Sequence, residues 1–259
     1  MTTWTYDGTD LSTFGVITEL DDYLDIAPRR GGDITIPNRH GELYVEKVYD
    51  SRSISFGMAI KASNAEALEQ VFDDLKTLFY SETQKVLANT RADTTVRTVL
   101  ATVEDTLQVR RESYNFARCV VNFKLANPFF RGEVATDDNT TVIDSDPTVY
   151  VVENIGNTKE TDPVIILTGP LENTVITNST TGAVLVYNGV IPSPRIVTIQ
   201  TVNMEYVAVD DLGANMIDNI EHVGSDFLMT FAPGDNNLSV ADDEATTGTV
   251  QFVFYPPYL

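Results

Sequence analysis

The chain has 259 residues, 42% of them hydrophobic and 9% aromatic, which is enough apolar material to form real cores and argues against disorder. Its 38 Asp and Glu residues outnumber 17 Lys and Arg, and the net charge of −21 disfavours partners that present phosphates, namely nucleic acids and anionic membranes. We also expect no membrane span and no secretory signal, because no run of apolar residues is long enough and the first residues lack the charged and apolar regions of a leader.

Charge is divided unevenly along the chain. Residues 1–131 contain 15 Lys and Arg and 19 Asp and Glu, a net charge of −4, whereas residues 132–259 contain 2 and 19, a net charge of −17. Such a change usually marks two separately built units, and domains of about 130 residues are common. The sequence therefore predicts two domains, 1–131 and 132–259.

The first half is predicted to be mostly extended. Short strands are expected at 35–39 and 43–48, and residues 52–61 alternate polar and apolar side chains as half-buried strands do. Further strands are expected at 95–103, 107–109 and 114–125, the last ended by Asn127 and Pro128. A single cysteine, Cys119, lies within the last strand, where we expect a buried, inert thiol that forms no intramolecular disulfide.

One helix interrupts these strands. Ser63 and Glu66 have the spacing of a capping box, in which two side chains satisfy the first free backbone amides. A helix of about 16 residues should follow, because apolar residues recur at steps of three and four. That apolar stripe, which we expect to pack on the sheet, consists of Leu68, Val71, Phe72, Leu75, Leu78 and Phe79.

The second half is predicted to contain strands throughout and no helix. Turn-forming residues separate short apolar runs at intervals of about 8–12 residues, which is typical of a β-sandwich or jelly roll. The expected strands are 149–152, 163–167, 174–178, 184–187, 195–200, 205–209, 226–231, 238–240 and 249–255.

Residues that carry chemistry are few. The only histidines, His40 and His222, lie in different predicted domains, and no nucleophile motif, zinc ligand set or nucleotide-binding glycine motif is present. Acidic segments at Asp137–Asn139, Asp210–Asp211, Asp235–Asn237 and Asp242–Glu244 contain oxygen ligands for calcium, but none matches an EF-hand loop. We therefore predict no enzyme activity, no cofactor and no metal.

Two other functions remain open at this point. Aromatic residues of the second half could stack on sugar rings of a host surface glycan, although their alternate positions in strands favour a place in the core. Paired carboxylates could hydrolyse a cell-wall polysaccharide, but nothing in the pattern selects a pair. The aromatic residues concerned are Tyr187, Tyr206, Phe227, Phe231, Phe252, Phe254, Tyr255 and Tyr258.

The order of several short motifs resembles that of the distal tail (Dit) proteins of long-tailed, siphovirus-type bacteriophages. In the first half these motifs are Phe14–Val16, Ala27–Arg30 and Pro37–Gly41, where Asn38 takes the usual place of a glycine. In the second half they are Asn154–Gly156, Asp162–Ile166, Leu167–Gly169, Ile176–Asn178, Thr181–Gly182 and Phe231–Asn237. The resemblance covers nearly the whole chain.

This resemblance implies a mainly β fold with two domains. The N-terminal one would be a sandwich or barrel-like domain with one packed α-helix, and the C-terminal one a galectin-like or jelly-roll sandwich. It implies a structural protein of the virion that forms a hexameric ring at the distal end of the tail, between the tail tube protein and the tail tip or baseplate proteins. DNA would pass through the lumen without specific binding, and the protein would be synthesised in the host cytoplasm. Arg29, Arg30 and Arg39 are the candidate interface residues, by their position in the motifs.

Overall fold

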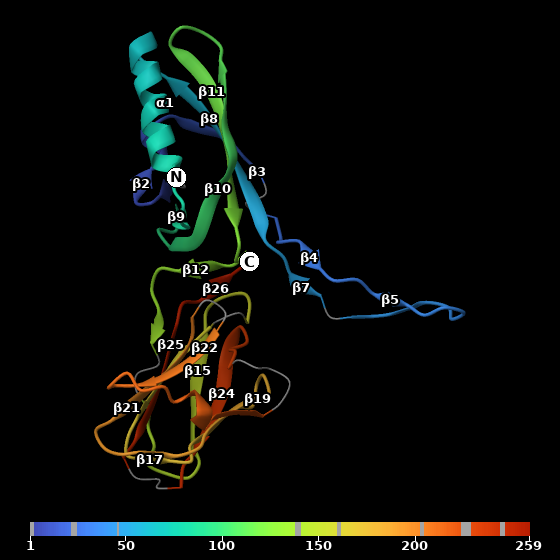
Figure 1. The fold of residues 1–259 in the computed structure, drawn as a ribbon, viewed down its shortest axis with the longest axis vertical. Helices are drawn as coiled ribbons and strands as arrows, with labels where there is room; N and C mark the ends of the chain where they lie inside the picture. The colour runs from blue at the N-terminus through green and yellow to red at the C-terminus, as the bar shows by residue number, and fades with distance from the viewer. Residues whose placement is uncertain are drawn as a thin grey trace. The chain divides into compact units, whose positions relative to one another are not determined.

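A computed structural model describes residues 3–21, 25–45, 47–137, 141–159, 162–202, 205–223, 229–243 and 247–259. The chain divides into two compact units, Met1–Phe130 together with Leu259, and Arg131–Tyr258. Both consist mainly of strands, and the described residues contain one α-helix, in the first unit (Figure 1). The predicted mainly β fold class is confirmed. No helix among the described residues is long and apolar enough to cross a membrane.

The first unit is built on one antiparallel sheet with the strand order β2-β1-β9-β10-β11-β8-β3. Strand β11, which corresponds to the strand predicted at 114–125, pairs with β10 on one side and β8 on the other and therefore lies inside the sheet. The strands are β1 (Thr3–Tyr6), β2 (Thr9–Asp10), β3 (Val16–Asp21), β8 (Arg52–Lys61), β9 (Lys85–Thr90), β10 (Val96–Arg111) and β11 (Phe116–Leu125).

Helix α1 (Ala65–Phe79) contributes Leu68, Leu75 and Phe79 to the core, as its apolar stripe predicts. The Phe79 ring packs on Phe123 of β11, with ring centroids 5.8 Å apart. The predicted serine cap is wrong by one residue. Asn64 is the N-cap, and its Oδ1 accepts a hydrogen bond of 2.8 Å from the amide of Ala67. A carboxamide oxygen reaches this amide as well as a hydroxyl does, so both residues were suitable caps.

Two of the strand predictions in the first unit need correction. The segments 95–103 and 107–109 form one strand, β10, whose pairing with β11 shifts register between Glu104 and Gln108. A β-bulge of this kind interrupts the alternation of polar and apolar residues without ending the strand. Strands β1 and β9, which pair with each other over Thr3–Tyr6, were not predicted.

The second unit is a β-sandwich. One sheet has the order β13-β25-β16-β21-β22 with β14 also paired to β25, and the other has the order β15-β24-β18-β19-β23. Both contribute to one core, in which Ile165 and Phe252 of the first sheet lie with Ile176 and Leu238 of the second. The strands are β13 (Thr136–Asp137), β14 (Thr141–Val142), β15 (Thr148–Asn154), β16 (Val164–Thr168), β18 (Val175–Asn178), β19 (Ala183–Tyr187), β21 (Ile196–Val202), β22 (Glu205–Asp210), β23 (Ile220–Val223), β24 (Gly234–Ala241) and β25 (Thr249–Phe254).

Most strands predicted for this half are present, with one exception. Of the expected strand 226–231, residues 226–228 lie outside the described residues and 229–231 form no strand. Two short pairs, of which the first forms a separate sheet, were not predicted, and neither was β23, because strands of two to four residues carry too little alternation to be recognised. These pairs are β17 (Leu171–Glu172) with β20 (Val190–Ile191), and β12 (Phe130–Gly132) with β26 (Pro257–Tyr258).

Three buried asparagines hold the segment before β24 onto the sandwich. The Nδ2 of Asn154 donates to the carbonyl of Phe231 at 2.8 Å, and the Nδ2 of Asn178 donates to that of Thr230 at 3.0 Å. Asn178 also donates to the Oδ1 of Asn236 at 3.2 Å, which links two of the three side chains directly. All three are fully buried, so their carboxamides replace the water that these backbone groups would otherwise bind.

We predict that Asn236→Ala destabilises the second unit by about 2–4 kcal/mol, because Asn236 donates to the carbonyls of Ala232, Gly234 and Val152 and their partner would be lost. The measurement is urea unfolding followed by circular dichroism. Asn237→Ala is the matched control: Asn237 is its exposed neighbour and should cost less than about 0.5 kcal/mol. Equal losses for the two variants would contradict a structural role for the buried carboxamide.

Cys119 is buried in β11, and burial raises the pKa of its thiol to about 11. At pH 8 only about one thiol in a thousand would then be ionised. We predict that the folded protein resists a thiol reagent such as dithionitrobenzoate and that the denatured protein reacts with one equivalent. Rapid labelling of the folded protein would show that the strand opens readily.

Candidate interaction sites

The described residues of 25–50, in the first unit, form an antiparallel ribbon, which we call the arm. Near its base β4 (Arg29–Arg30) pairs with β7 (Val48–Tyr49), and further along β5 (Ile34–Thr35) pairs with β6 (Glu42–Leu43) (Figure 1). The segments predicted at 35–39 and 43–48 thus contain less strand than expected, because most of their residues lie in the turn or between the paired steps.

The tip of the arm is a turn that depends on unusual backbone angles. Asn38 has φ +60° and Gly41 has φ +83°, both in the left-handed region. Asparagine tolerates this region better than other residues with a side chain, so Asn38 can stand where a glycine is usual. The amide of Arg39 donates to the carbonyl of Ile36 at 3.2 Å and closes the turn.

The base of the arm is held by Arg29. Its guanidinium donates to the Tyr49 hydroxyl at 3.0 Å and lies 4.9 Å from the centre of that ring. The Tyr49 ring in turn meets Phe129 edge to face, with centroids 5.6 Å apart. Further out, the amide of Val45 and the ammonium of Lys47 bind the Asp33 carboxylate and hold its pKa below the usual value.

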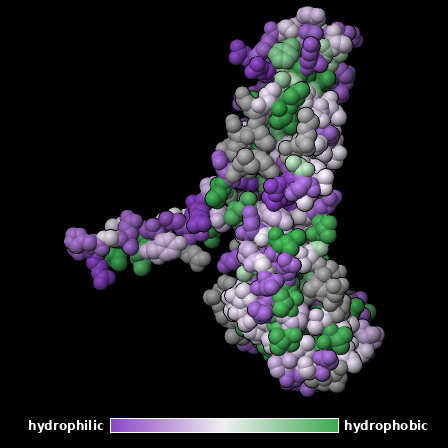
Figure 2. All heavy atoms as spheres, turned by 180° about the vertical axis from the view of Figure 1, so that it is seen from behind, coloured by the Kyte–Doolittle hydropathy of each residue, from purple (hydrophilic) through white to green (hydrophobic). Residues whose placement is uncertain are grey.

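The arm has no core of its own. None of its described residues from Pro28 to Asp50 is buried, and five large apolar side chains are 53–73% exposed. Figure 2 shows such apolar atoms on the surface of the arm among hydrophilic ones. An isolated two-stranded ribbon is marginally stable in water, so a ribbon that displays apolar side chains is typical of a segment that packs on a partner. These side chains are Ile26, Ile34, Leu43, Tyr44 and Val48.

The three predicted interface arginines all lie on the arm, two at its base and one at its tip. Arg29 and Arg30 lie on β4 and Arg39 in the tip turn, and all three are exposed. Arg29 is already engaged by Tyr49, whereas Arg30 and Arg39 form no ion pair with the described residues. Sequence reasoning missed the exposed apolar residues of the arm, because exposure is decided by the absence of anything packed against them.

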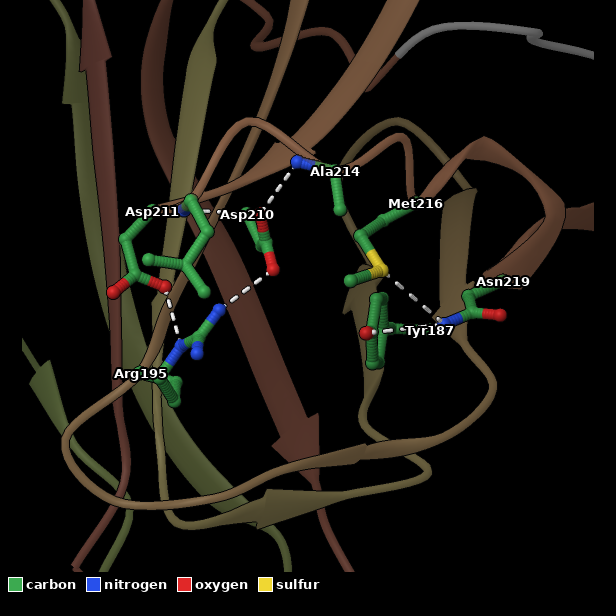
Figure 3. Close-up of polar contacts among 8 residues, drawn as sticks. Tyr187, Arg195, Asp210, Asp211, Ala214, Met216 and Asn219 are labelled. Atoms are coloured by element: carbon green, nitrogen blue, oxygen red, sulfur yellow. Dashed lines mark hydrogen bonds and ion pairs between the residues drawn. The ribbon is translucent and has the colours of Figure 1, made fainter.

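A second site lies in the acidic unit. Tyr187, Val190, Ile191, Val197 and Met216 line a pocket of about 240 Å³, with Arg195 and Asp210 at its rim. The Arg195 guanidinium donates to Asp210 at 2.7 Å and to Asp211 at 2.6 Å (Figure 3). Partial desolvation raises the pKa of Asp211, but the hydrogen bonds from Arg195 and the Ile196 backbone outweigh it and leave the pKa below its usual value.

The acidic segments considered as calcium ligands mostly have other roles. Asp210 and Asp211 bind Arg195, and Asp242 is buried and accepts hydrogen bonds from the amide of Glu172 and the hydroxyl of Thr174. Asp138, Asn139 and Glu244 lie outside the described residues. Within the described part of the chain, no three His, Cys, Asp or Glu residues are grouped so as to hold a metal ion.

The aromatic residues weighed as a sugar platform are mainly internal. Tyr187, Phe231, Phe252 and Phe254 are buried in the sandwich, and Phe231 stacks on Phe254 with centroids 4.9 Å apart. Phe227 lies outside the described residues. The core position favoured by their alternation is therefore confirmed for these four side chains.

Comparison with known proteins agrees with this architecture. Residues 9–125 match a family described as phage tail protein RIFT-related domain, and no curated protein matches the chain in sequence. Among solved structures, the Dit protein of phage SPP1, titled a paradigm of the hub adsorption apparatus in phages that infect Gram-positive hosts, has a TM-score of 0.72 at 17% identity and covers 100% of both chains. Chains from two structures of the phage P2 baseplate in its activated conformation, with Ca and with Sr, have TM-scores of 0.45 and 0.46 at 9% and 8% identity over 98% of each chain.

Residues 9–125 thus match the phage tail RIFT-related family, over a little less than half of the chain. Over its whole length it has the fold of SPP1 Dit. The predicted resemblance to the distal tail proteins of siphovirus-type phages is confirmed by these two findings together.

We predict that trypsin cleaves the free protein first within the arm, at Arg29, Arg30, Arg39 or Lys47, because no core protects this segment. Limited digestion followed by mass spectrometry identifies the first cut. Double substitution of Arg30 and Arg39 by glutamine should slow the first cut. First cuts within β8 to β11 would contradict the prediction.

Proposed function

We propose that this chain forms a ring, built from six copies, at the distal end of a phage tail. In this role it joins the tail tube protein to the tail tip or baseplate proteins and leaves a lumen through which DNA passes. It acts as a structural component of the virion without catalysis, and its position there follows from assembly with the other tail proteins.

The arm is the observation that carries the proposal. In a closed ring each subunit offers one surface to a different surface of its neighbour, so a segment made to lie on another molecule is expected. The arm carries the exposed apolar residues Leu43 and Tyr44 and the exposed cations Arg30 and Arg39, so it offers both apolar contact and charge to such a neighbour. The near-neutral first half suits close packing of copies, whereas halves with a charge of −17 would repel one another.

The charge also supports a passive passage for DNA. Binding to duplex DNA depends on Lys and Arg residues that neutralise phosphates. A protein with a net charge of −21 would not retain DNA that moves past it. A lumen needs this property, because the genome must pass through without being held.

A role without catalysis is supported by the state of the reactive residues. Cys119 is buried with a raised pKa, so it is a poor nucleophile. His40 lies exposed near the tip of the arm, in a different unit from His222. Among the described residues, His40 forms no hydrogen bond with a possible nucleophile, as acyl transfer would need.

The test is light scattering of the purified protein, with negative-stain images of the same peak. Six copies of 28.6 kDa give about 172 kDa, and we expect rings with an open centre. Replacing both Leu43 and Tyr44 by Asp should convert the ring to smaller species, because two charges would be buried at the contact. If the protein remains a monomer when mixed with the tail tube protein as well as alone, the ring is wrong.

Val149→Asp is the matched control, since Val149 is a similarly exposed apolar residue on β15 of the acidic unit. It should leave the mass unchanged. Loss of the ring in this variant but not in the arm variant would move the subunit contact from the arm to the sandwich.

A further inference from the structure

Strand β15 forms one edge of the acidic sandwich. It pairs with β24 over all seven of its residues, and no other strand in the described part of the chain pairs with it (Figure 1). Val149 and Val151 are 67% and 53% exposed and Glu153 is also exposed, so this strand is open to solvent. An edge strand presents unpaired N–H and C=O groups to any chain that can pair with them.

The contacts of β24 show which residues of β15 bond to it. The carbonyl of Asn237 accepts from the amide of Ser179 at 2.9 Å, and the amide of Asn237 donates to the Thr180 hydroxyl at 3.0 Å, so both groups point toward β18. In an antiparallel sheet this direction alternates along the strand, so the backbone groups of Leu238 point toward β15. Leu238 lies opposite Tyr150, which therefore bonds to β24.

The alternate residues of β15 direct their backbone groups to the free edge. These residues are Val149, Val151 and Glu153, of which Val151 lies opposite Asn237. None of their N–H and C=O groups has a hydrogen-bond partner within the described residues. The edge thus offers three donors and three acceptors in one row.

Two other edge strands carry features that prevent such pairing. Strand β3, at the edge of the sheet in the first unit, has a bulge between Ile17 and Glu19. Strand β22, at the edge of the other sheet of the sandwich, is covered by the segment that follows it, where the amide of Met216 donates to the carbonyl of Ala208 at 2.8 Å. Strand β15 contains no bulge, proline or lysine. A long edge without such features is typical of a site that pairs with another chain.

Two carboxylates lie at one end of this edge. Glu153 stands directly opposite Asp235 of β24, both are exposed, and neither forms an ion pair within the described residues. Like charges directly opposite each other destabilise a sheet, so a cation placed beside them is favoured. Residues 132–259 contain only two cations, Lys159 and Arg195, and Arg195 is already bound by two aspartates. A strand from another protein could supply the missing positive charge.

A second copy of β15 fits this edge poorly. Two such strands, paired antiparallel about Val151, would place Val149 opposite Glu153 and bring no cation to the carboxylates. They would also bring together two halves that each carry a net charge of −17. Beside the two valines the favoured neighbours are apolar, because β-branched and aromatic cross-strand pairs stabilise a sheet.

We propose that the free edge of β15 accepts an extended segment of another protein as an added strand. The segment pairs through its backbone with Val149, Val151 and Glu153. It carries apolar side chains beside the two valines and a lysine or arginine beside Glu153. This inference goes beyond the proposed function, because it concerns an unlike partner of the second unit and does not depend on a ring.

The experiment measures fluorescence polarisation of a labelled peptide mixed with the full chain. The probe is acetyl-Thr-Lys-Thr-Val-Thr-Val-Thr-amide, which in the antiparallel direction places its lysine beside Glu153 and its valines beside Val151 and Val149. We expect saturable binding, about fivefold weaker when glutamate replaces the lysine of the peptide. Absence of saturable binding would overturn the proposal, and equal binding of the two peptides would overturn the choice of a basic partner.

A modified peptide tests whether the backbone makes the contact. N-methylation of the first valine of the peptide removes the amide that donates to the carbonyl of Val151 and should abolish binding. N-methylation of the threonine that follows is the matched control, because the amide of that residue points away from β15, and binding should persist. Equal effects of the two methyl groups would show that strand addition is wrong.

Variants of the protein test the same contact from the other side. Val151→Pro removes a donor from the free edge and should abolish binding, while the fold is retained, because proline is tolerated on an edge strand whose N–H faces solvent. Val151→Thr keeps the amide and should bind as the unmodified chain does. Glu153→Lys combined with Asp235→Asn provides a second variant, which should bind the glutamate peptide more tightly than the lysine peptide.

Two results with these variants would contradict the proposal. Binding that survives Val151→Pro would show that the peptide lies elsewhere. A lower mass of Val151→Pro than of the unmodified chain in light scattering would show that the edge pairs copies of this chain instead of an unlike partner.

Discussion

The acidic sandwich depends on one constraint: its buried backbone carbonyls need hydrogen-bond donors. Its segment from Met229 to Pro233 carries buried residues into the core without belonging to a strand, so its carbonyls cannot be paired by a sheet. Asn154, Asn178 and Asn236 supply those partners. Phe231 is thereby held between Phe252 and Phe254, and the two sheets close over one core.

Because the core is formed by the inward-facing residues of the strands, the charged residues of this unit can occupy the outward-facing positions and the turns. Alternation along a strand requires only that one face be apolar; it does not prescribe what the other face carries. In this sandwich the strands of both sheets carry carboxylates, as Asp210 on β22 and Glu221 on β23 show.

The arm is stabilised differently from the sandwich. The arm displays large apolar side chains on a thin ribbon, which is held mainly by Arg29, Tyr49 and Asp33. An isolated two-stranded ribbon of this kind is only marginally stable in water. Under the proposed function, a neighbouring subunit would supply the packing that the ribbon lacks.

The sequence alone determined the β-rich class, the single helix and the ordered motifs of the distal tail proteins, because these depend on local alternation, capping and turn residues. The asparagines of the motifs at 154–156, 176–178 and 231–237 were visible as turn chemistry, but only the tertiary structure showed that they meet, since their partners lie up to 84 residues away. The exposure of Ile34 and Tyr44 and the pocket at Arg195 were likewise decided by tertiary structure. Each depends on what packs, or does not pack, against a residue, and no local pattern encodes that.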